Sequence, residues 1–158
     1  MPIYLNYDNI PGDVTSQGHE QWVECNSFQW GVGRGMGSPT GTQKDRESST
    51  PSISEIVITK PYDAATSKLF HESVAGTLDK TVKLEFTTTT ANQTTTYLYY
   101  ELTNTGISGW SQSSSGDSPM ESISLNFTKV MMKVVPMDPD VQGTPDAVTY
   151  DLSTQTTS

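Results

Sequence analysis

Apolar and polar side chains alternate with a period of two in several separate stretches of this chain, as they do in half-buried β-strands. Residues 2–7, 82–86 and 98–102 follow the pattern without interruption. In residues 20–32 and 121–135 the apolar side chains change parity part-way along. A strand cannot move its apolar side chains to its other face without an extra residue, so both of these segments are predicted to bend.

The first bend is predicted near Asn26-Ser27, because Val23 and Cys25 have one parity while Phe28 and Trp30 have the other. Long bent strands of this kind close small barrels. The expected fold is therefore mainly β: a single small β-barrel of bent antiparallel strands.

The composition agrees with this fold class. Thr and Ser supply 42 of the 158 residues, and only 17% of the residues are charged. Abundant Thr together with Val, Ile and Tyr favours strands. Disordered chains usually combine low hydrophobicity with dense charge, and helical bundles are rich in Ala, Leu, Glu and Lys, so both classes fit poorly.

One short helix is predicted, over residues of about 64–75, flanking the barrel. The carboxylate of Asp63 can accept from the free amides of the first turn, and Gly76 lies where a left-handed cap belongs. A helix this short must pack on the sheet or cover an open end of the barrel. The apolar side chains expected along one side of it are Ala65, Leu69, Phe70 and Val74.

Two segments lack strand periodicity. Residues 33–52 form an extended Gly-rich loop of about twenty residues, where connections usually span about 4–6; a loop of this length is disordered or serves a purpose. Residues 136–158 are polar and acidic, and only residues 147–150 are expected to add a short strand. The predicted organisation is a barrel domain over residues 1–135 followed by an acidic C-terminal tail.

The charge excludes two classes of partner. The net charge is −9, whereas nucleic acids and anionic membranes attract surfaces rich in Lys and Arg.

No apolar run approaches the roughly 20 residues of a membrane-spanning helix. The N-terminal residues show neither a basic nor an apolar region of a signal peptide. We therefore expect a cytoplasmic protein that leaves the cell, if at all, without a cleaved leader.

No catalytic, cofactor or metal site is predicted. His71-Glu72 fails the zinc-protease motif because Ala75 stands where the second His belongs. Cys25 lies in an apolar strand and is expected to be a small buried residue. Glu20 and Glu24 lie two alternations apart on one predicted strand, but a solvated face explains them better than paired-carboxylate chemistry. The chain is expected not to be an enzyme.

Tyr97 and Tyr99 lie on the strand face opposite Leu98 and Tyr100. Such a pair can form a stacking or sugar-binding platform. When both faces of a strand in a small barrel are apolar, however, one face must meet the helix or a neighbour. A subunit interface is the preferred interpretation.

Four segments in order resemble one family. Residues 10–13 read IPGD, residues 28–32 read FQWGV, residues 56–69 read IVITKPYDAATSKL and residues 121–130 read ESISLNFTKV. In this order and spacing the chain resembles, from about residue 2 to residue 135, the haemolysin-coregulated protein (Hcp) family, the tube subunits of bacterial type VI secretion systems.

The resemblance implies a β-barrel with one flanking helix that assembles into a homohexameric ring. In the family, rings stack into a tube inside a contractile sheath, tipped by a spike protein of the valine-glycine repeat type (VgrG). The tube is expelled and carries effector proteins in its lumen. The loop between the second and third strands reaches the neighbouring ring, which would give residues 33–52 a purpose. The candidate stacking residues in this loop are Arg34, Met36, Lys44 and Arg46.

Three other interpretations stay open at this stage. The tail-tube protein of a contractile phage-like particle shares the same fold logic. A monomeric secreted β-barrel module could bind a ligand on the Tyr97 and Tyr99 face, and would have an accessible pocket. A small hydrolase would use Glu20 and Glu24.

Overall fold

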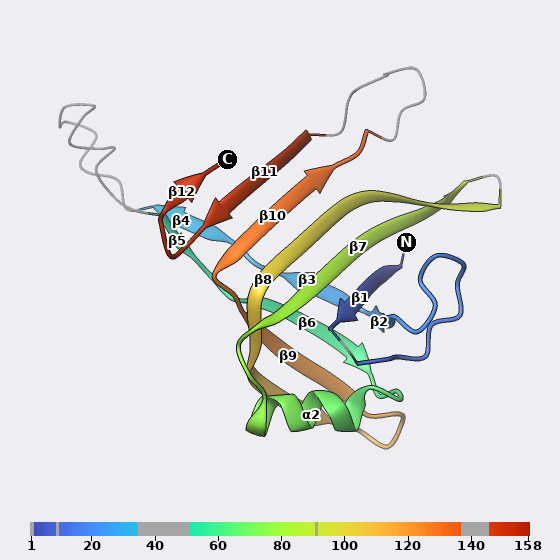
Figure 1. The fold of residues 1–158 in the computed structure, drawn as a ribbon. Helices are drawn as coiled ribbons and strands as arrows, with labels where there is room; N and C mark the ends of the chain where they lie inside the picture. The colour runs from blue at the N-terminus through green and yellow to red at the C-terminus, as the bar shows by residue number, and fades with distance from the viewer. Residues whose placement is uncertain (1, 9, 35–50, 91, 137–145) are drawn as a thin grey trace, which may run out of the picture.

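The computed structural model describes residues 2–8, 10–34, 51–90, 92–136 and 146–158. Among these residues strands dominate, and one helix follows the sixth strand (Figure 1). The elements are β1 (Ile3–Tyr7), β2 (Val23–Cys25), β3 (Ser27–Gln29), β4 (Val32–Arg34), β5 (Pro51–Ile53), β6 (Ile56–Pro61), α2 (Thr66–Ala75), β7 (Lys80–Thr90), β8 (Gln93–Ser113), β9 (Met120–Asn126), β10 (Lys129–Val134), β11 (Asp146–Asp151) and β12 (Thr156–Thr157).

Apart from β4 and β5, which pair with each other, the strands form two antiparallel sheets that share β8. Sheet 1 has the order β12-β11-β10-β8-β7-β1-β2, and sheet 2 has the order β3-β6-β9-β8. Strand β8 is 21 residues long; its first part pairs with β7 and β10, and its last part pairs with β9. The sheets also meet where β2 continues into β3, without closing into one barrel. The mainly β class is confirmed, and the predicted barrel is replaced by two joined sheets.

Both predicted bends are confirmed. Asn26 separates β2 from β3, and its amide donates to the carbonyl of Thr59 at 2.7 Å. The second bend separates β9 from β10, where the amide of Thr128 donates to the carbonyl of Thr103 at 3.2 Å. Each bend passes the chain from one sheet to the other, so the apolar side chains face the core on both sides of it despite their change of parity.

The core fills the space between the two sheets. Sheet 1 buries Leu5, Val82 and Leu84 completely or almost completely, and sheet 2 buries Ile58 and Ile123. All five occupy the apolar positions of the period-two pattern. The alternation in the sequence therefore identified the inward-facing side of these strands correctly.

Helix α2 lies across one end of the two sheets (Figure 1). The carboxylate of Asp63 accepts from the amide of Ala65 at 2.9 Å, as predicted for the helix start. Gly76 has φ −76° and extended backbone, so the predicted left-handed cap is wrong. The glycine is required instead by a close approach, because a Cβ atom there would lie 2.5 Å from the carbonyl oxygen of Glu72.

The predicted buried side of the helix is only half correct. Ala65 and Leu69 are fully buried, whereas Phe70 and Val74 are exposed. An amphipathic pattern identifies an apolar stripe, but the sheet end is too narrow to cover all of it.

Both segments without periodicity contain strands. β4 and β5 form a two-stranded hairpin in which Val32 pairs with Ile53 and Arg34 with Pro51, so the prediction of an irregular loop is wrong at both of its ends. Met36, Lys44 and Arg46 lie outside the described residues.

In the tail, β11 pairs with β10 over six residue pairs. The expected short strand is confirmed, and it extends sheet 1; the division of the chain at residue 135 stays a prediction.

Candidate assembly surfaces

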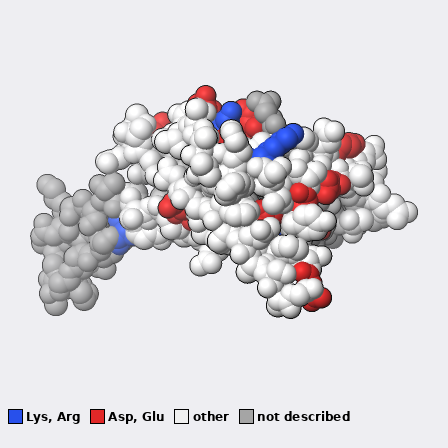
Figure 2. Space-filling view, turned by 90° about the horizontal axis from the view of Figure 1, so that it is seen from below, with Lys and Arg blue, Asp and Glu red and all other residues white. Residues whose placement is uncertain are grey.

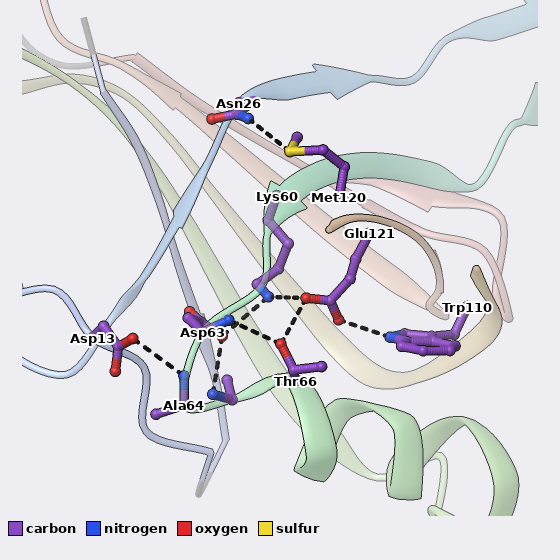
Figure 3. A network of polar contacts seen from close by, with 10 residues as sticks. Asp13, Asn26, Lys60, Asp63, Ala64, Thr66, Trp110, Met120 and Glu121 are labelled. Atoms are coloured by element: carbon purple, nitrogen blue, oxygen red, sulfur yellow. Dashed lines mark hydrogen bonds and ion pairs between the residues drawn. The ribbon is translucent and has the colours of Figure 1, made fainter. Parts of the chain in front are cut away.

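A buried polar network joins the start of α2 to sheet 2 (Figure 3). Lys60 ends the inward-facing row of β6 and is paired in register with Glu121 of β9, and both side chains are fully buried. The Lys60 Nζ atom lies 2.6 Å from Glu121 Oε2 and 3.0 Å from Asp63 Oδ1. Thr66 Oγ1 donates to Glu121 Oε2 at 2.7 Å, and Trp110 Nε1 donates to Glu121 Oε1 at 3.0 Å.

Each charge in this network has a partner, which is the condition for burying charges without a large penalty. Asp13 adds a further link from the chain between β1 and β2, since its carboxylate accepts from the amide of Ala64 at 3.2 Å. The network thereby fixes the entry of α2 relative to β6, β8 and β9. From the sequence, Asp63 was predicted to cap the helix, and Lys60 entered only within the segment 56–69 that carries the resemblance. The usable signal for the network was a Lys and a Glu at inward-facing positions of two strands.

An exposed apolar surface lies over this network. Phe70 is 49% exposed, Val74 71% and Leu78 66%. The Phe70 ring lies 5.1 Å from the ring of Trp110 (centroid to centroid), and Leu78 packs over Gly106, where a Cβ atom would overlap its side chain. We call Phe70, Val74 and Leu78 the helix ridge. In the view from the α2 side most of the surface is uncharged, and charged side chains occur in small separate groups (Figure 2).

An apolar groove lies at the other end of the molecule, between the β4–β5 hairpin and strands β10 and β11. Its cavity volume is about 270 Å³, and none of the described residues that line it is charged. Val32, on its rim, is 64% exposed. We call this the hairpin groove; the lining residues that matter below are Trp30, Val32, Ile53, Met132, Val148 and Tyr150.

The structure places Tyr97 and Tyr99 on β8 of sheet 1, both half-buried. Tyr99 Oη donates to Glu101 Oε2 at 2.8 Å, and burial followed by this hydrogen bond raises the pKa of Tyr99. The Tyr97 ring packs edge-on against Phe86, with centroids 6.3 Å apart. Part of this predicted interface is therefore already covered by the chain itself.

The candidate chemical residues are not brought together. Cys25 is buried, and burial raises the pKa of its thiol to about 12. His19 contacts Glu85 and stacks on Tyr4, with ring centroids 4.6 Å apart. Glu20 precedes the strand, because β2 begins only at Val23, so the predicted common strand face with Glu24 is wrong.

Two general properties of the described residues bear on function. In the described part of the chain, no group of three or more His, Cys, Asp or Glu side chains could hold a metal ion. Among the same residues, no helix is long and apolar enough to cross a membrane.

Residues 4–134 match the model of the family described as "Type VI secretion system effector, Hcp". This chain belongs to the Hcp family. No relative among the curated proteins matches it.

Solved structures of Hcp and related type VI secretion proteins resemble the whole chain. One, "Structure of a type six secretion system protein", has a TM-score of 0.89 at 26% identity over 99% of both chains. Hcp1 from Salmonella typhimurium has a TM-score of 0.77 at 22% identity over 99% of this chain and 97% of that chain. A type VI secretion system effector from Yersinia pestis has a TM-score of 0.72 at 19% identity, covering 94% and 98%.

Membership of the Hcp family makes this chain a type VI secretion tube or effector protein. Hcp proteins are structural and secreted, which agrees with the expectation of a protein without enzymatic activity. The features of this Hcp protein that bear on its function are accordingly surfaces: the helix ridge, the hairpin groove, the β4–β5 hairpin and the Tyr97–Tyr99 face.

Proposed function

We propose that this Hcp protein is the tube subunit of a type VI secretion system, and that six copies close into a ring. The observation that carries the proposal is the family match over residues 4–134. Exposed apolar side chains on an acidic chain give independent support, because such surfaces mark contacts between proteins. Rings then stack into the expelled inner tube, with effector proteins carried in its lumen.

The stacking contact is proposed for residues 33–52, through Arg34, Met36, Lys44 and Arg46. Arg34 supports this, since it is exposed and ends β4 at the base of the hairpin. Contacts of basic side chains with an acidic surface on the next ring suit a chain of net charge −9.

The Tyr97–Tyr99 face of sheet 1 is proposed as a second contact between subunits. A cavity of about 440 Å³ opens beside Tyr99, lined also by Met131 and Lys133. A neighbouring chain could insert side chains there.

The remaining partners follow from the same proposal. They are the VgrG spike protein at the tip, the contractile sheath around the tube and the effectors inside it. The domain of residues 1–135 is proposed as the tube body, and the acidic segment that follows it adds β11 and β12 to its sheet 1. The protein assembles in the cytoplasm and is then secreted.

Native mass spectrometry and electron microscopy of the purified protein test this proposal. We expect a mass six times that of the chain and rings with six-fold symmetry, without added ligand. A protein that remains a 17.3 kDa monomer at micromolar concentration would contradict the proposal.

A further inference from the structure

Two apolar, uncharged surfaces lie at different ends of this molecule. The helix ridge lies with α2 at one end, and the hairpin groove lies between β4–β5 and β10–β11 at the other (Figure 1). The ridge side chains are exposed, and the groove encloses a cavity of about 270 Å³. Because they are far apart on one chain, neither can cover the other within the same molecule.

The helix ridge is supported from beneath. Trp110 of β8 carries the Phe70 ring, and its indole nitrogen is held by Glu121, which is itself fixed by Lys60 and Thr66. Phe70 and Val74 lie one helical turn apart and therefore project side by side. The exposed apolar side chains are thus preorganised, so little side-chain freedom remains to be lost when they pack against a partner.

The hairpin groove has the complementary character. Trp30 and Tyr150 contribute ring surface, and Val32 and Val148 stand exposed at its sides. Aromatic side chains in a hollow, largely uncharged surface are typical of the buried centre of a protein interface.

We propose that the helix ridge of one copy packs into the hairpin groove of the next copy, and that this contact closes the ring. The proposal rests on the self-assembly proposed above and assigns one of its contacts to residues. A contact between two different surfaces of identical chains is heterologous, so it repeats from copy to copy and ends only when the ring closes.

The charge of the chain limits where two copies can contact one another. Each copy carries a net charge of −9, so two copies repel one another over most of their surfaces. The ridge side chains are apolar, and in the part of the chain that the structure describes the groove is lined by uncharged residues. These are the surfaces at which two copies can meet closely without burying like charges.

The test uses two variants, Val74→Glu on the ridge and Val148→Glu in the groove. Each places a charge in the proposed contact at an exposed residue, so each chain should fold and remain a monomer. Mixed one to one, the variants should form heterodimers and no larger species, because one intact ridge and one intact groove remain. Ala75→Glu, a neighbouring exposed helix residue with the same charge change, should still form rings.

A second measurement does not depend on breaking the contact. A chain with Val74→Cys and Val148→Cys in a Cys25→Ala background should yield a ladder of covalent oligomers on mild oxidation, ending at the closed ring. Either cysteine alone should give no ladder.

Three outcomes overturn the inference. If wild type and both glutamate variants all form rings, the ridge–groove contact is wrong while the proposed function stands. If the variants are monomers that do not pair on mixing, or if the double-cysteine chain gives no ladder, the contact is not heterologous. If wild type itself is a monomer, the proposed function fails together with the inference.

Discussion

Glu121 is the residue on which the buried polar network depends. It accepts from Lys60, Thr66 and Trp110 simultaneously, and its side chain is fully buried. Glu121→Ala leaves the Lys60 ammonium buried with Asp63 as its remaining anion. Breaking a buried ion pair on one side costs about 3–5 kcal/mol, and because Asp63 remains we expect a loss near the lower limit.

Urea unfolding of purified protein measures this loss. The matched control is Glu101→Gln, which removes a half-buried carboxylate whose hydrogen bond comes from Tyr99. The control should change the unfolding free energy by about 1 kcal/mol or less. Equal effects of the two substitutions would show that the network contributes no more than a surface hydrogen bond.

Because the thiol of Cys25 is buried, we expect the folded protein to lose stability at alkaline pH. Burial raises its pKa to about 12 in the folded chain, whereas an unfolded thiol titrates near 8.5. Below pH 8.5 both states are protonated and the stabilising contribution is complete. As the pH rises towards 12, the unfolded state loses its proton first, so stability falls by up to about 1.4 kcal/mol per pH unit.

Cys25→Ala should flatten this decline between about pH 8.5 and 9.5, before unfolded tyrosines with their ordinary pKa near 10 lose most of their protons. Urea unfolding of both chains at several pH values in this range is the measurement. Ring formation by Cys25→Ala at neutral pH should match wild type. Identical slopes for the two chains would mean that the thiol titrates normally in the folded state.

At this scale the sequence predicts which side chains point inward but not which of them meet. Lys60 has the same parity as Ile58, and Glu121 the same parity as Ile123, so the alternation alone places both charges in the core. Their pairing depends on the register between β6 and β9, which lie about sixty residues apart in the chain. No local pattern encodes that register.

Among the elements, the end of α2 gives a direct test of packing. A Cβ atom at Gly76 would lie 2.5 Å from the carbonyl oxygen of Glu72 and 2.9 Å from its Cα atom. Since both atoms belong to the backbone, Gly76→Ala must displace the helix end, and we expect a loss of about 1–3 kcal/mol. Thermal unfolding followed by circular dichroism measures the change.

Gly31→Ala is the control, because a Cβ atom there meets no atom within 4 Å. Replacing such a glycine restricts the unfolded chain and should change stability by less than about 1 kcal/mol, in either direction. A Gly76→Ala chain as stable as the Gly31→Ala chain would show that the contact at the helix end relaxes without cost.

The elements also show where prediction from the sequence ends. The long strands and both bends follow from the period of two, because five or more alternating residues define a face. The three-residue strands β4 and β5 are too short to show a pattern. For α2 the sequence identified the apolar stripe, but the exposure of Phe70 and Val74 depends on how much of the helix the sheets can cover.

At the scale of the whole molecule, the helix ridge and the hairpin groove expose apolar side chains that the folding of a single subunit does not require. The same period-two pattern would build a stable isolated subunit with polar residues at Val74 and Val148. The residues of a surface that contacts another copy are determined by the shape of that copy. They are therefore not regularly spaced along the sequence. This is why the pattern predicted the fold and a subunit interface at Tyr97 and Tyr99, whereas the ring and its stacking were predicted only from the family resemblance.

The long loop supplies the last prediction. Because Arg34 pairs with Pro51 in the β4–β5 hairpin, the two ends of the intervening segment are held side by side. A short Gly-Ser link replacing residues 36–49 can therefore connect the two strands without disturbing the hairpin. The core side chains lie elsewhere, so the melting temperature and ring formation should stay near wild type.

Stacking should respond differently, because the replacement removes Met36, Lys44 and Arg46, three of the four proposed stacking residues. Electron microscopy should show single rings without tubes, and secretion should be lost. The charge-reversal variant Arg34→Glu distinguishes the effect of loop charge from the effect of loop length, because it leaves the loop at full length. It should weaken stacking most at low salt, where electrostatic contacts are strongest. Tubes and normal secretion from the shortened chain would show that stacking depends on other surfaces, and a shortened chain that fails to fold would assign the loop to the subunit itself.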